Sequence, residues 1–343
     1  MNLTLADYSD ETKQEILQFF SDVPFKALMW DWQFLESPQA EDTGFKPVIS
    51  QDEIGVTAFN GVMPVKFKYR HDEIEALWSC DFHVAERVRG TGLGKALKFE
   101  LKSRAPLIMS LGVSPTASIV LQKMGWVRHD CVKAYRRYES ISSWRDVVFW
   151  ALQTANRVLF RYSRLFEGDV ILWDHLPTKP ELDELWAEVS NHYQKAVVRD
   201  HQYLHWRYCQ HPLAKYQFIH ARESDNSRLR AVLVVRYSDS VLRIVDYLGP
   251  LDRKDIFLSM LRLCSEHFPR LRQWVAVTSD PMQTAVLKAF GFYQARSHPA
   301  FYVLDKVNSE SQAGWFISSG DSDGEALAAC WDNWNSDRRS KPS

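Results

Sequence analysis

An internal repeat constrains the fold of this 343-residue chain more than any other feature of its sequence. The segment WQFLESP, which begins at Trp32, recurs as WRYCQHP at Trp206, 174 residues later. Further along, SPTASIVLQKMGW from Ser114 resembles DPMQTAVLKAFGF from Asp280, at a separation of 166 residues. Landmarks that return in the same order at similar distances indicate duplication of a whole folding unit. The sequence therefore predicts two copies of one fold in tandem.

Each copy has the pattern of a mixed α+β domain. An aromatic segment with helical character opens each copy, at residues 15–35 and 182–208. In the first copy, polar turn residues separate four strand-like runs, KPVIS, IGVTAFN, VMPVKFKYR and EALWSCDFHV. A helix over 93–104, a strand LIMSLGV, a helix over 115–124 and a strand over 126–138 follow. This order predicts a mixed, mainly antiparallel sheet with packed helices in each copy.

The repeat sets the expected domain boundaries. We expect a first domain over 1–140, a linker helix over 141–166, a second domain over 167–307 and a polar tail over 308–343. The tail contains Trp315, Trp331 and Trp334. Because tryptophan is rare in disordered segments, part of the tail should dock on the folded body.

The linker segment 144–166 has apolar residues at helical spacing, with Arg145, Arg157, Arg161 and Arg164 on much of the remainder. One interpretation is a helix packed between the two domains, with its basic residues in solvent. The other is weak contact with an anionic membrane surface, which basic amphipathic helices also make.

Charge and cysteine content exclude several classes of function. Lys plus Arg number 42 and Asp plus Glu number 43, so no general positive field recruits nucleic acid. The five cysteines are scattered without a CxxC pair, which favours neither a disulfide framework nor a zinc site. The N-terminus lacks the basic and apolar regions of a signal peptide. We expect a cytoplasmic protein without a metal.

The segment RVRGTGLGKAL, from Arg87 to Leu97, predicts an anion-binding turn between a strand and a helix. Glycine lets the backbone turn sharply and approach a ligand closely, and the helix N-terminus that follows favours phosphate. The spacing does not match a P-loop, and Gly90, Gly92 and Gly94 do not form GxGxxG. ATP and dinucleotides are therefore disfavoured.

Within this segment, RGTGLG fits the pattern Q/R-x-x-G-x-G/A of the GNAT superfamily of N-acyltransferases, and SPTASIVLQKMGW resembles that family's later helix and strand. The WQFLESP and WRYCQHP elements resemble two-domain acyltransferases linked to surface polysaccharides. The resemblance implies two tandem GNAT-like domains and acetyl-CoA as cosubstrate. It implies that strand residues His83 and Val84 pair with the pantetheine arm and that Ser114 lies at the cofactor. The implied pyrophosphate cradle is formed by Arg89, Gly90, Thr91, Gly92, Leu93, Gly94 and Lys95.

Three positions depart from the family pattern. Ser114 stands where an asparagine is common, and Leu121 stands where a tyrosine commonly protonates the leaving thiolate. Trp78 stands near the place of the commonly cited glutamate base. A substitute group must act, or the chemistry depends mostly on positioning.

Asp81 and His83 are the candidate catalytic residues. They lie two apart directly before the loop, so alternation along a strand places them on one face. Asp81 could bind or deprotonate an amine, and a neutral histidine is a suitable base. Asp246 occupies the corresponding place in the second copy, which favours a structural role as the alternative. By the same alternation Cys80 points away from Asp81, so a covalent route through this thiol is disfavoured.

The second copy has KDIFLS, from Lys254, where the first has RGTGLG. It lacks glycine there, so we predict one acyl-CoA site, in the first copy. Its segment RDHQYLHWRYCQHP is rich in basic and aromatic residues that could bind substrate or pack in a core. His201 and His205 have metal-ligand spacing but no acidic residue between them as in HExxH. The basic residues of this segment are Arg199, His201, His205, Arg207 and His211.

The sequence thus predicts an N-acyltransferase that moves an acetyl group from acetyl-CoA to the amine of a small molecule, such as an amino sugar, in a ternary complex. Alternatives are a non-catalytic protein that binds acyl-CoA or a partner, a Fem-type aminoacyl transferase, and a mycothiol-synthase-like tandem enzyme. The acceptor, the acyl length and the oligomeric state stay open.

Overall fold

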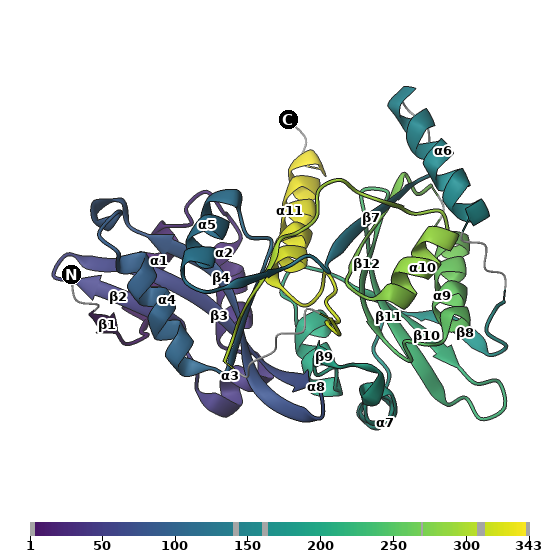
Figure 1. Cartoon of the computed structure of the whole chain (residues 1–343), viewed down its shortest axis with the longest axis horizontal. Coiled ribbons are helices and arrows are strands. Elements are labelled where there is room, and N and C mark those ends of the chain that lie inside the picture. The colour runs from purple at the N-terminus through teal and green to yellow at the C-terminus, as the bar shows by residue number, and fades with distance from the viewer. Residues whose placement is uncertain (1–3, 140–143, 160–163, 269, 307–312, 341–343) are drawn as a thin grey trace.

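The chain forms two mixed β-sheets flanked by helices, and helix α11 lies between the two halves (Figure 1). The computed structural model describes residues 4–139, 144–159, 164–268, 270–306 and 313–340. None of the helices in these ranges combines the length and apolar character that a bilayer crossing requires.

The first sheet takes most of its strands from the N-terminal half. Its order is β1-β2-β3-β4-β5-β15-β6, and β9 pairs with β3. The long strands β3 and β4 form the centre and pair over nearly their whole length. The strands are β1 (Leu5–Ala6), β2 (Val48–Asp52), β3 (Gly55–Tyr69), β4 (Asp72–Val84), β5 (Leu107–Leu111), β6 (Val127–His129), β9 (Lys195–Val197) and β15 (Phe301–Asp305).

The second sheet has the order β14-β7-β13-β12-β11-β10-β8. Each sheet has one parallel pair with antiparallel strands on both sides of it. The parallel pairs are β4 with β5 and β12 with β13. This repeated topology confirms the predicted fold class of two similar mixed domains. The strands are β7 (Lys133–Tyr138), β8 (Asp169–Trp173), β10 (Gln217–Arg222), β11 (Leu229–Ser238), β12 (Val241–Leu248), β13 (Gln273–Thr278) and β14 (Tyr293–Gln294).

The first sheet contains two strands from the other half, β9 and β15, and the second sheet contains one, β7. β7 lies between β13 and β14, and β15 lies between β5 and β6. The single strand expected over 126–138 is instead two strands, because a turn at Asp130 and Cys131 separates β6 from β7. Consequently the expected boundaries at residues 140 and 307 do not coincide with the edges of the sheets.

Local capping signals explain why the repeated segments form matching helices. Ser114 begins one helix, where its hydroxyl accepts a hydrogen bond from Ala117 N–H at 3.2 Å. Asp280 begins the other, where its carboxylate accepts from Gln283 N–H at 2.7 Å. In each case proline follows the cap at the first helical position, where its missing N–H costs nothing.

Helices flank both sheets, with shorter turns between them (Figure 1). They are α1 (Asp10–Gln18), α2 (Lys26–Phe34), α3 (Pro38–Thr43), α4 (Leu93–Arg104), α5 (Pro115–Lys123), α6 (Trp144–Leu159), α7 (Lys179–Val189), α8 (His201–Leu204), α9 (Lys254–His267), α10 (Pro281–Ala289) and α11 (Asp323–Ser340). Single turns occur at Glu86–Val88, Ser190–His192 and, as a π-helix, His205–Cys209.

The repeated tryptophans meet each other at the junction of the halves. Trp32 Nε1 donates to the carbonyl oxygen of Trp206 at 2.9 Å, and Trp206 Nε1 donates to the carbonyl oxygen of Trp32 at 3.0 Å. The two rings stack with centroids 5.3 Å apart. The tryptophan that recurs in the sequence repeat therefore makes a reciprocal contact, which joins the two halves.

The first sheet has two different faces. On one face, α4 and α5 pack through a separate core that includes Leu97, Leu101 and Leu121. On the other, α1 and α2 pack through a core that includes Trp30 and is continuous with the core of the second half. The α1–α2 face thus points toward the junction, where residues from both halves can meet.

Helix α6 packs at the outer edge of the second sheet, against α10, β7 and β14, and not between the halves (Figure 1). The packed-linker interpretation therefore does not describe its position. Residues 140–143 and 160–163 of the predicted linker lie outside the described residues.

Candidate acyl-CoA and acceptor sites

Strands β4 and β5 diverge at the edge of the sheet where the glycine loop begins. Their parallel pairing runs from Ala76 to Trp78 of β4 and ends at the pair Trp78–Met109. Strand β4 then continues to Val84, and among the described residues no strand pairs with this side of it. Ser110 Oγ donates to the Ser79 carbonyl at 3.0 Å just past the last pair. The first half therefore has an open wedge along β4 past Ser79, where among the described residues no strand pairs with this side of β4.

The loop after β4 has empty space around its glycines, which a loop that binds an anion through its backbone requires. Gly90 and Gly92 have φ angles of +81° and +88°, and a Cβ built on either would meet nothing within 4 Å. The first hydrogen bond of α4 joins Ala96 N–H to the Gly92 carbonyl at 3.1 Å. The preceding amides of Leu93, Gly94 and Lys95 thus have no helical acceptor. Since phosphate favours such a helix N-terminus, the residues present fit the pyrophosphate of a coenzyme A thioester.

The other predicted loop residues shape this turn. A Cβ on Gly94 would lie 3.0 Å from the ring of Phe82 and 3.3 Å from Val84, so glycine permits the helix to approach the strand closely. Arg89 Nε donates to the Val84 carbonyl at 3.1 Å, and Thr91 Oγ1 donates to the Val88 carbonyl at 2.8 Å. Leu93 is buried, and Lys95 lies over the Phe99 ring at 5.5 Å.

Ser114 lies at the same edge as the glycine loop, because β4 and β5 run parallel and both loops follow their carboxyl ends. Its hydroxyl caps α5. Leu121, at the position of the family tyrosine, is buried in the α4–α5 core. Trp78 is buried too, so neither position offers an acid or a base.

A β-bulge sets the direction of the Asp81 side chain. Gly61 pairs with Cys80 and Asn60 pairs with Phe82, so Asp81 is the extra residue between them. Its φ angle is +44°, which a non-glycine residue rarely adopts. Gln33 Nε2 donates both to Cys80 Sγ at 3.8 Å and to Asp81 Oδ2 at 3.1 Å. Both side chains therefore contact α2, and the expectation that Cys80 faces away was wrong because the bulge interrupts strand alternation.

Asp81 belongs to a charged cluster at the junction of the halves. The ammonium of the buried Lys26 contacts Asp81 directly and also donates to Gln33 Oε1 at 2.7 Å. Asp323, which begins α11, brings a second carboxylate from the other half of the chain. Ligand atoms of Cys80, Asp81 and Asp323 lie within 4.8 Å of one another. The cluster is thus a pair of carboxylates that faces an ammonium group.

Burial and the Asp81 carboxylate raise the pKa of Asp323 to about 6. Burial also raises the pKa of the Cys80 thiol well above its usual value. The thiol therefore stays protonated near neutral pH and is a poor nucleophile. Within the cluster, the Asp323 carboxyl rather than the Cys80 thiol can therefore exchange a proton near neutral pH.

His83 lies on the same face of β4 as Asp81. Its ring stacks on Phe19 with centroids 4.3 Å apart, and Phe20 contacts both His83 and the Lys26 ammonium. Burial, and then the positive charge of Arg89, lower the pKa of His83. The imidazole is therefore neutral at pH 7 and able to accept a proton.

Lys98 is a buried cation that the sequence did not single out. It projects from α4 onto β4, where its Nζ donates to Ser79 Oγ at 2.7 Å and lies over the rings of Phe82 and Trp126. No acidic side chain of the described residues forms a salt bridge with it. Burial lowers the pKa of Lys98 to about 7. Its hydrogen-bond partner Ser79 is the first residue past the last β4–β5 pair.

The matching wedge of the second half is filled by the chain itself. The β12–β13 pairing ends at Ile244–Ala276, and residues 315–321, the plug segment, continue between the strands. Ser279 N–H donates to the Ile317 carbonyl, and Gly320 N–H donates to the Val245 carbonyl, both at 3.0 Å. Backbone groups that would face a ligand in the first half are therefore paired internally in the second.

Buried ion pairs hold the plug segment in place. Arg199 donates to Asp246 Oδ1 at 3.0 Å and to both oxygens of Asp321 at 2.8 and 2.9 Å. Ser318 Oγ also donates to Asp246 Oδ1 at 3.0 Å. Asp246 thus has a structural role. The bulge of β12 falls at Val245, so Asp81 corresponds to Val245 and the sequence match to Asp246 is displaced by one residue.

The basic residues of the second copy are divided between packing and surface. Arg207 is buried and donates to the carbonyls of Gly320 and Ser322. His211 Nδ1 accepts from two backbone amides, and burial lowers its pKa to about 3. With Arg199 in the plug network, only His201 and His205 stay part-exposed, and their rings stack 5.5 Å apart.

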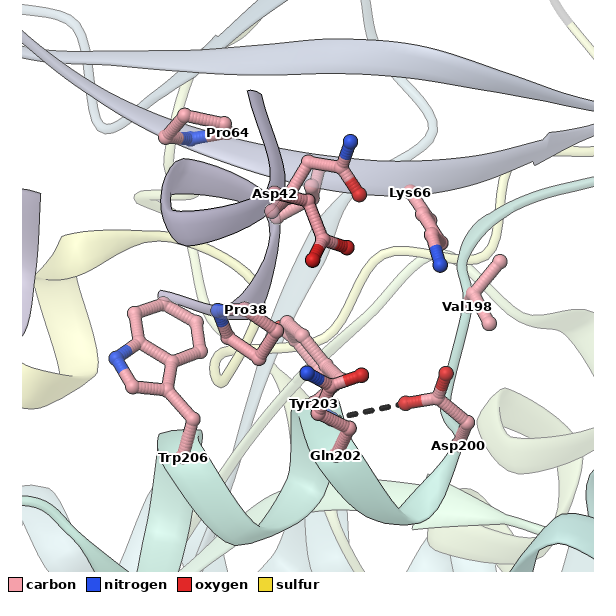
Figure 2. A pocket seen from close by; sticks show the side chains of 11 residues that line it. Pro38, Asp42, Pro64, Lys66, Val198, Asp200, Gln202, Tyr203 and Trp206 are labelled. Atoms are coloured by element: carbon pink, nitrogen blue, oxygen red, sulfur yellow. Dashed lines mark hydrogen bonds between the residues drawn. The ribbon is translucent and has the colours of Figure 1, made fainter. Parts of the chain in front are cut away.

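Two hollows adjoin the junction. Figure 2 shows the smaller, between α3, β3 and α8, where Tyr203 N–H donates to Asp200 Oδ1 at 2.8 Å. Its volume of about 20 Å³ suits a single water molecule. The larger, of about 200 Å³, lies between the halves. Leu111 and Gly112 line it from the first half, and the second half supplies most of its lining, including the charged Arg243 and Glu325. This hollow is the candidate acceptor pocket.

Solved structures with the GNAT fold resemble this chain over most of its length. A GCN5-related N-acetyltransferase from Anabaena variabilis ATCC 29413 has a TM-score of 0.59 at 12% identity, covering 88% of this chain and 72% of its own. A second such protein, from Kribbella flavida, has a TM-score of 0.57 at 11% identity, covering 88% and 71%.

A conserved protein from Enterococcus faecalis V583, described as a probable N-acyltransferase, has a TM-score of 0.58 at 11% identity and covers the same shares, 88% and 71%. No family model and no curated protein matches the sequence. At these identities the likeness shows the fold, which is that of the GCN5-related N-acetyltransferases.

Proposed function

We propose that this chain is an acyl-CoA-dependent N-acyltransferase with one donor site, in the first half. The observation that carries the proposal is the open wedge between β4 and β5, with an unfilled glycine loop at its mouth and Asp81 on its rim. The second wedge is filled by the plug segment, which supports a single site for each chain.

In this proposal the backbone holds the donor. The amides of Leu93, Gly94 and Lys95 bind the pyrophosphate, and the free side of residues 79–84 pairs with the amide groups of the pantetheine arm. A coenzyme A thioester, most simply acetyl-CoA, supplies the acyl group. Holding donor and acceptor together in a ternary complex provides much of the acceleration.

Asp81 and Asp323 hold and deprotonate the acceptor amine. The two neighbouring carboxylates, of which Asp81 lies on the wedge strand β4, attract a protonated amine, and Asp81 or the neutral His83 takes its proton. The amine nitrogen then bonds to the acyl carbon as the carbon–sulfur bond breaks, and the nitrogen loses its second proton to the other of these two bases. Lys98 holds a proton near the apex of the wedge that the leaving thiolate can accept. This lysine would take the role of the tyrosine that the family commonly has at the position of Leu121.

The acceptor is proposed to be a small amine such as an amino sugar, in a surface-polysaccharide pathway of the cytoplasm. A pocket of about 200 Å³ is small for a ligand site, which supports an acceptor of few atoms. All five cysteines are free, as a reducing compartment requires.

Calorimetric titration of the full chain with acetyl-CoA tests the donor site, with free CoA, longer acyl-CoAs and ATP as comparisons. We expect one acetyl-CoA for each chain and no ATP binding. A thiol-release assay over a panel of amines and nucleotide-linked amino sugars then tests the acceptor. Failure of every CoA species to bind would overturn the proposal.

Binding without thiol release from any amine would favour the non-catalytic alternative. Aminoacyl-tRNA is the comparison donor for the Fem-type alternative, and acyl transfer from it but not from acetyl-CoA would favour that function. A cysteine-linked sugar amine in the same panel addresses the mycothiol-synthase-like alternative.

A further inference from the structure

Helix α6 presents apolar side chains to solvent. Six large apolar residues along its 16 residues are 47 to 75% exposed. Because successive helical residues are 100° apart, these positions cover one continuous side of the helix, interrupted only by small residues and Thr154. They are Val147, Val148, Trp150, Leu152, Val158 and Leu159. An exposed apolar strip of this length marks a contact surface.

The opposite side of α6 carries polar groups toward the protein. Gln153 is buried, and its carboxamide accepts from Tyr138 N–H at 2.7 Å and donates to the Tyr138 carbonyl at 3.0 Å. Asn156 Nδ2 donates to the Phe292 carbonyl at 2.7 Å. Phe149 stacks on Tyr293 at 4.8 Å. These contacts fix the rotation of the helix, so the apolar side cannot turn inward without breaking three hydrogen bonds.

The charge around this strip is positive. Residues 147–166 contain Arg157, Arg161 and Arg164 and no aspartate or glutamate. Arg157 and Arg164 are exposed, and Arg161 lies outside the described residues. Basic residues beside an apolar helical face match the phosphate layer of an anionic bilayer.

The dimensions of α6 favour a membrane over a second copy of the chain. A helix of 16 residues is about 24 Å long and ~10 Å wide, so one side offers roughly 250 Å². Specific dimers bury about 800 Å² on each partner. The helix also stands at the outer edge of the molecule, where it can reach a flat surface (Figure 1).

We propose that α6 docks this protein on an anionic membrane surface, with its apolar side in the headgroup layer. The proposal does not depend on the acyltransferase function. A helix of this length lies in the interface and does not cross the bilayer. The polar contacts of Gln153 and Asn156 hold the helix in the orientation that docking requires.

Vesicle flotation of the full chain tests the proposal. Vesicles of phosphatidylcholine with 30% phosphatidylglycerol are compared with pure phosphatidylcholine, at low and high salt. We expect wild type to float with the anionic vesicles and less with neutral ones or in high salt. Trp150→Ser with Leu159→Ser should lower the bound fraction roughly tenfold or more, because it removes two large side chains from the apolar side.

The matched control is Leu28→Ser with Ile54→Ser, which removes two side chains of similar exposure, 61 and 82%, from the first half. Circular dichroism and thermal unfolding check that both variants fold. The proposal is overturned if wild type does not bind anionic vesicles or if the α6 variant binds as well as wild type. Sedimentation velocity without vesicles distinguishes the second copy, because self-association lost in the α6 variant would assign this surface to a dimer instead.

Discussion

In the first half, β4 and β5 part after Trp78 and Met109 and leave one side of β4 without a strand partner among the described residues. In the second half, β12 and β13 part after Ile244 and Ala276, and the plug segment forms hydrogen bonds with both strands. The same topology thus gives one wedge that is open and one that is filled. The two similar halves thus differ at the same place, because the chain uses the second wedge to anchor its own C-terminal segment.

The filled wedge also contributes to the open one. The plug segment leads directly into Ser322 and Asp323, and Arg207 of the second half holds the Ser322 carbonyl. The second half therefore brings the Asp323 carboxylate next to Asp81 of the first half.

The largest expected effect comes from releasing the plug segment. Asp246→Ala leaves Arg199 partly uncompensated in the interior and should lower the free energy of unfolding by about 3–5 kcal/mol. Urea unfolding measures it. The control Asp130→Ala removes an exposed pair with Arg128 and should cost less than about 1 kcal/mol. Equal effects would show that this network does not hold the plug segment.

Closing the open wedge should abolish donor binding. Gly92→Glu places a side chain and a negative charge in the loop and should weaken acetyl-CoA binding by roughly 10³-fold, as measured by calorimetry. Gly44→Glu is the matched control, because Gly44 also has a positive φ angle, +64°, and open space around its Cα. If Gly92→Glu retained affinity, the loop would not be the donor site.

Asp81→Asn tests the acceptor side of the same wedge. It keeps the shape of the side chain but removes the base, so kcat should fall by roughly 10²-fold while acetyl-CoA affinity is unchanged. Steady-state kinetics and calorimetry on the same preparation separate the two quantities. An unchanged kcat would assign Asp81 to a structural role, as for Asp246.

Lys98→Met should have the smallest effect, about tenfold on kcat, which is below the usual hundredfold or more for proton transfer because a thiolate is a good leaving group. The pKa of Lys98 is about 7, so its proton is lost above this pH and wild-type kcat should fall there. The methionine variant should lack this alkaline decrease, and Lys98→Arg should not restore kcat because arginine does not release its proton. A variant profile that keeps the wild-type shape would exclude Lys98 as the donor.

Lys98→Met should lower kcat but raise the stability of the folded protein. Burial lowers the folded-state pKa of Lys98 from 10.5, so between pH 7 and 10.5 the unfolded chain binds one more proton than the folded chain. This group therefore makes unfolding free energy rise with pH in that window. Lys98→Met should remove that contribution and raise the melting temperature near pH 7, since no buried charge remains.

The sequence was informative where a few adjacent residues decide the structure. The helix predicted over 93–104 is α4 (Leu93–Arg104), because its apolar spacing and the glycine before it are local signals. The helices after Ser114 and Asp280 follow from a capping residue and a proline. The glycine loop was predicted for the same reason, since positive φ angles at Gly90 and Gly92 need glycine.

Residues brought together over long distances had no such signal. Lys26 and Asp323 are far apart in the chain and meet only because α11 lies between the halves (Figure 1). Lys98 follows Leu97 at the edge of the apolar side of α4, where a lysine usually reaches solvent. The shift from Asp246 to Val245 as the counterpart of Asp81 became visible only in the two bulges.

By itself, then, the sequence determined the internal repeat, several helices and strands and the glycine-rich turn before α4, because periodicity, capping and glycine act within a few residues. Tertiary structure alone decided that β7 and β15 change sheets, that one wedge is filled and that α6 turns its apolar side outward. Those outcomes depend on which distant surfaces bury each other, and alternation along a strand or helix carries no information about the partner.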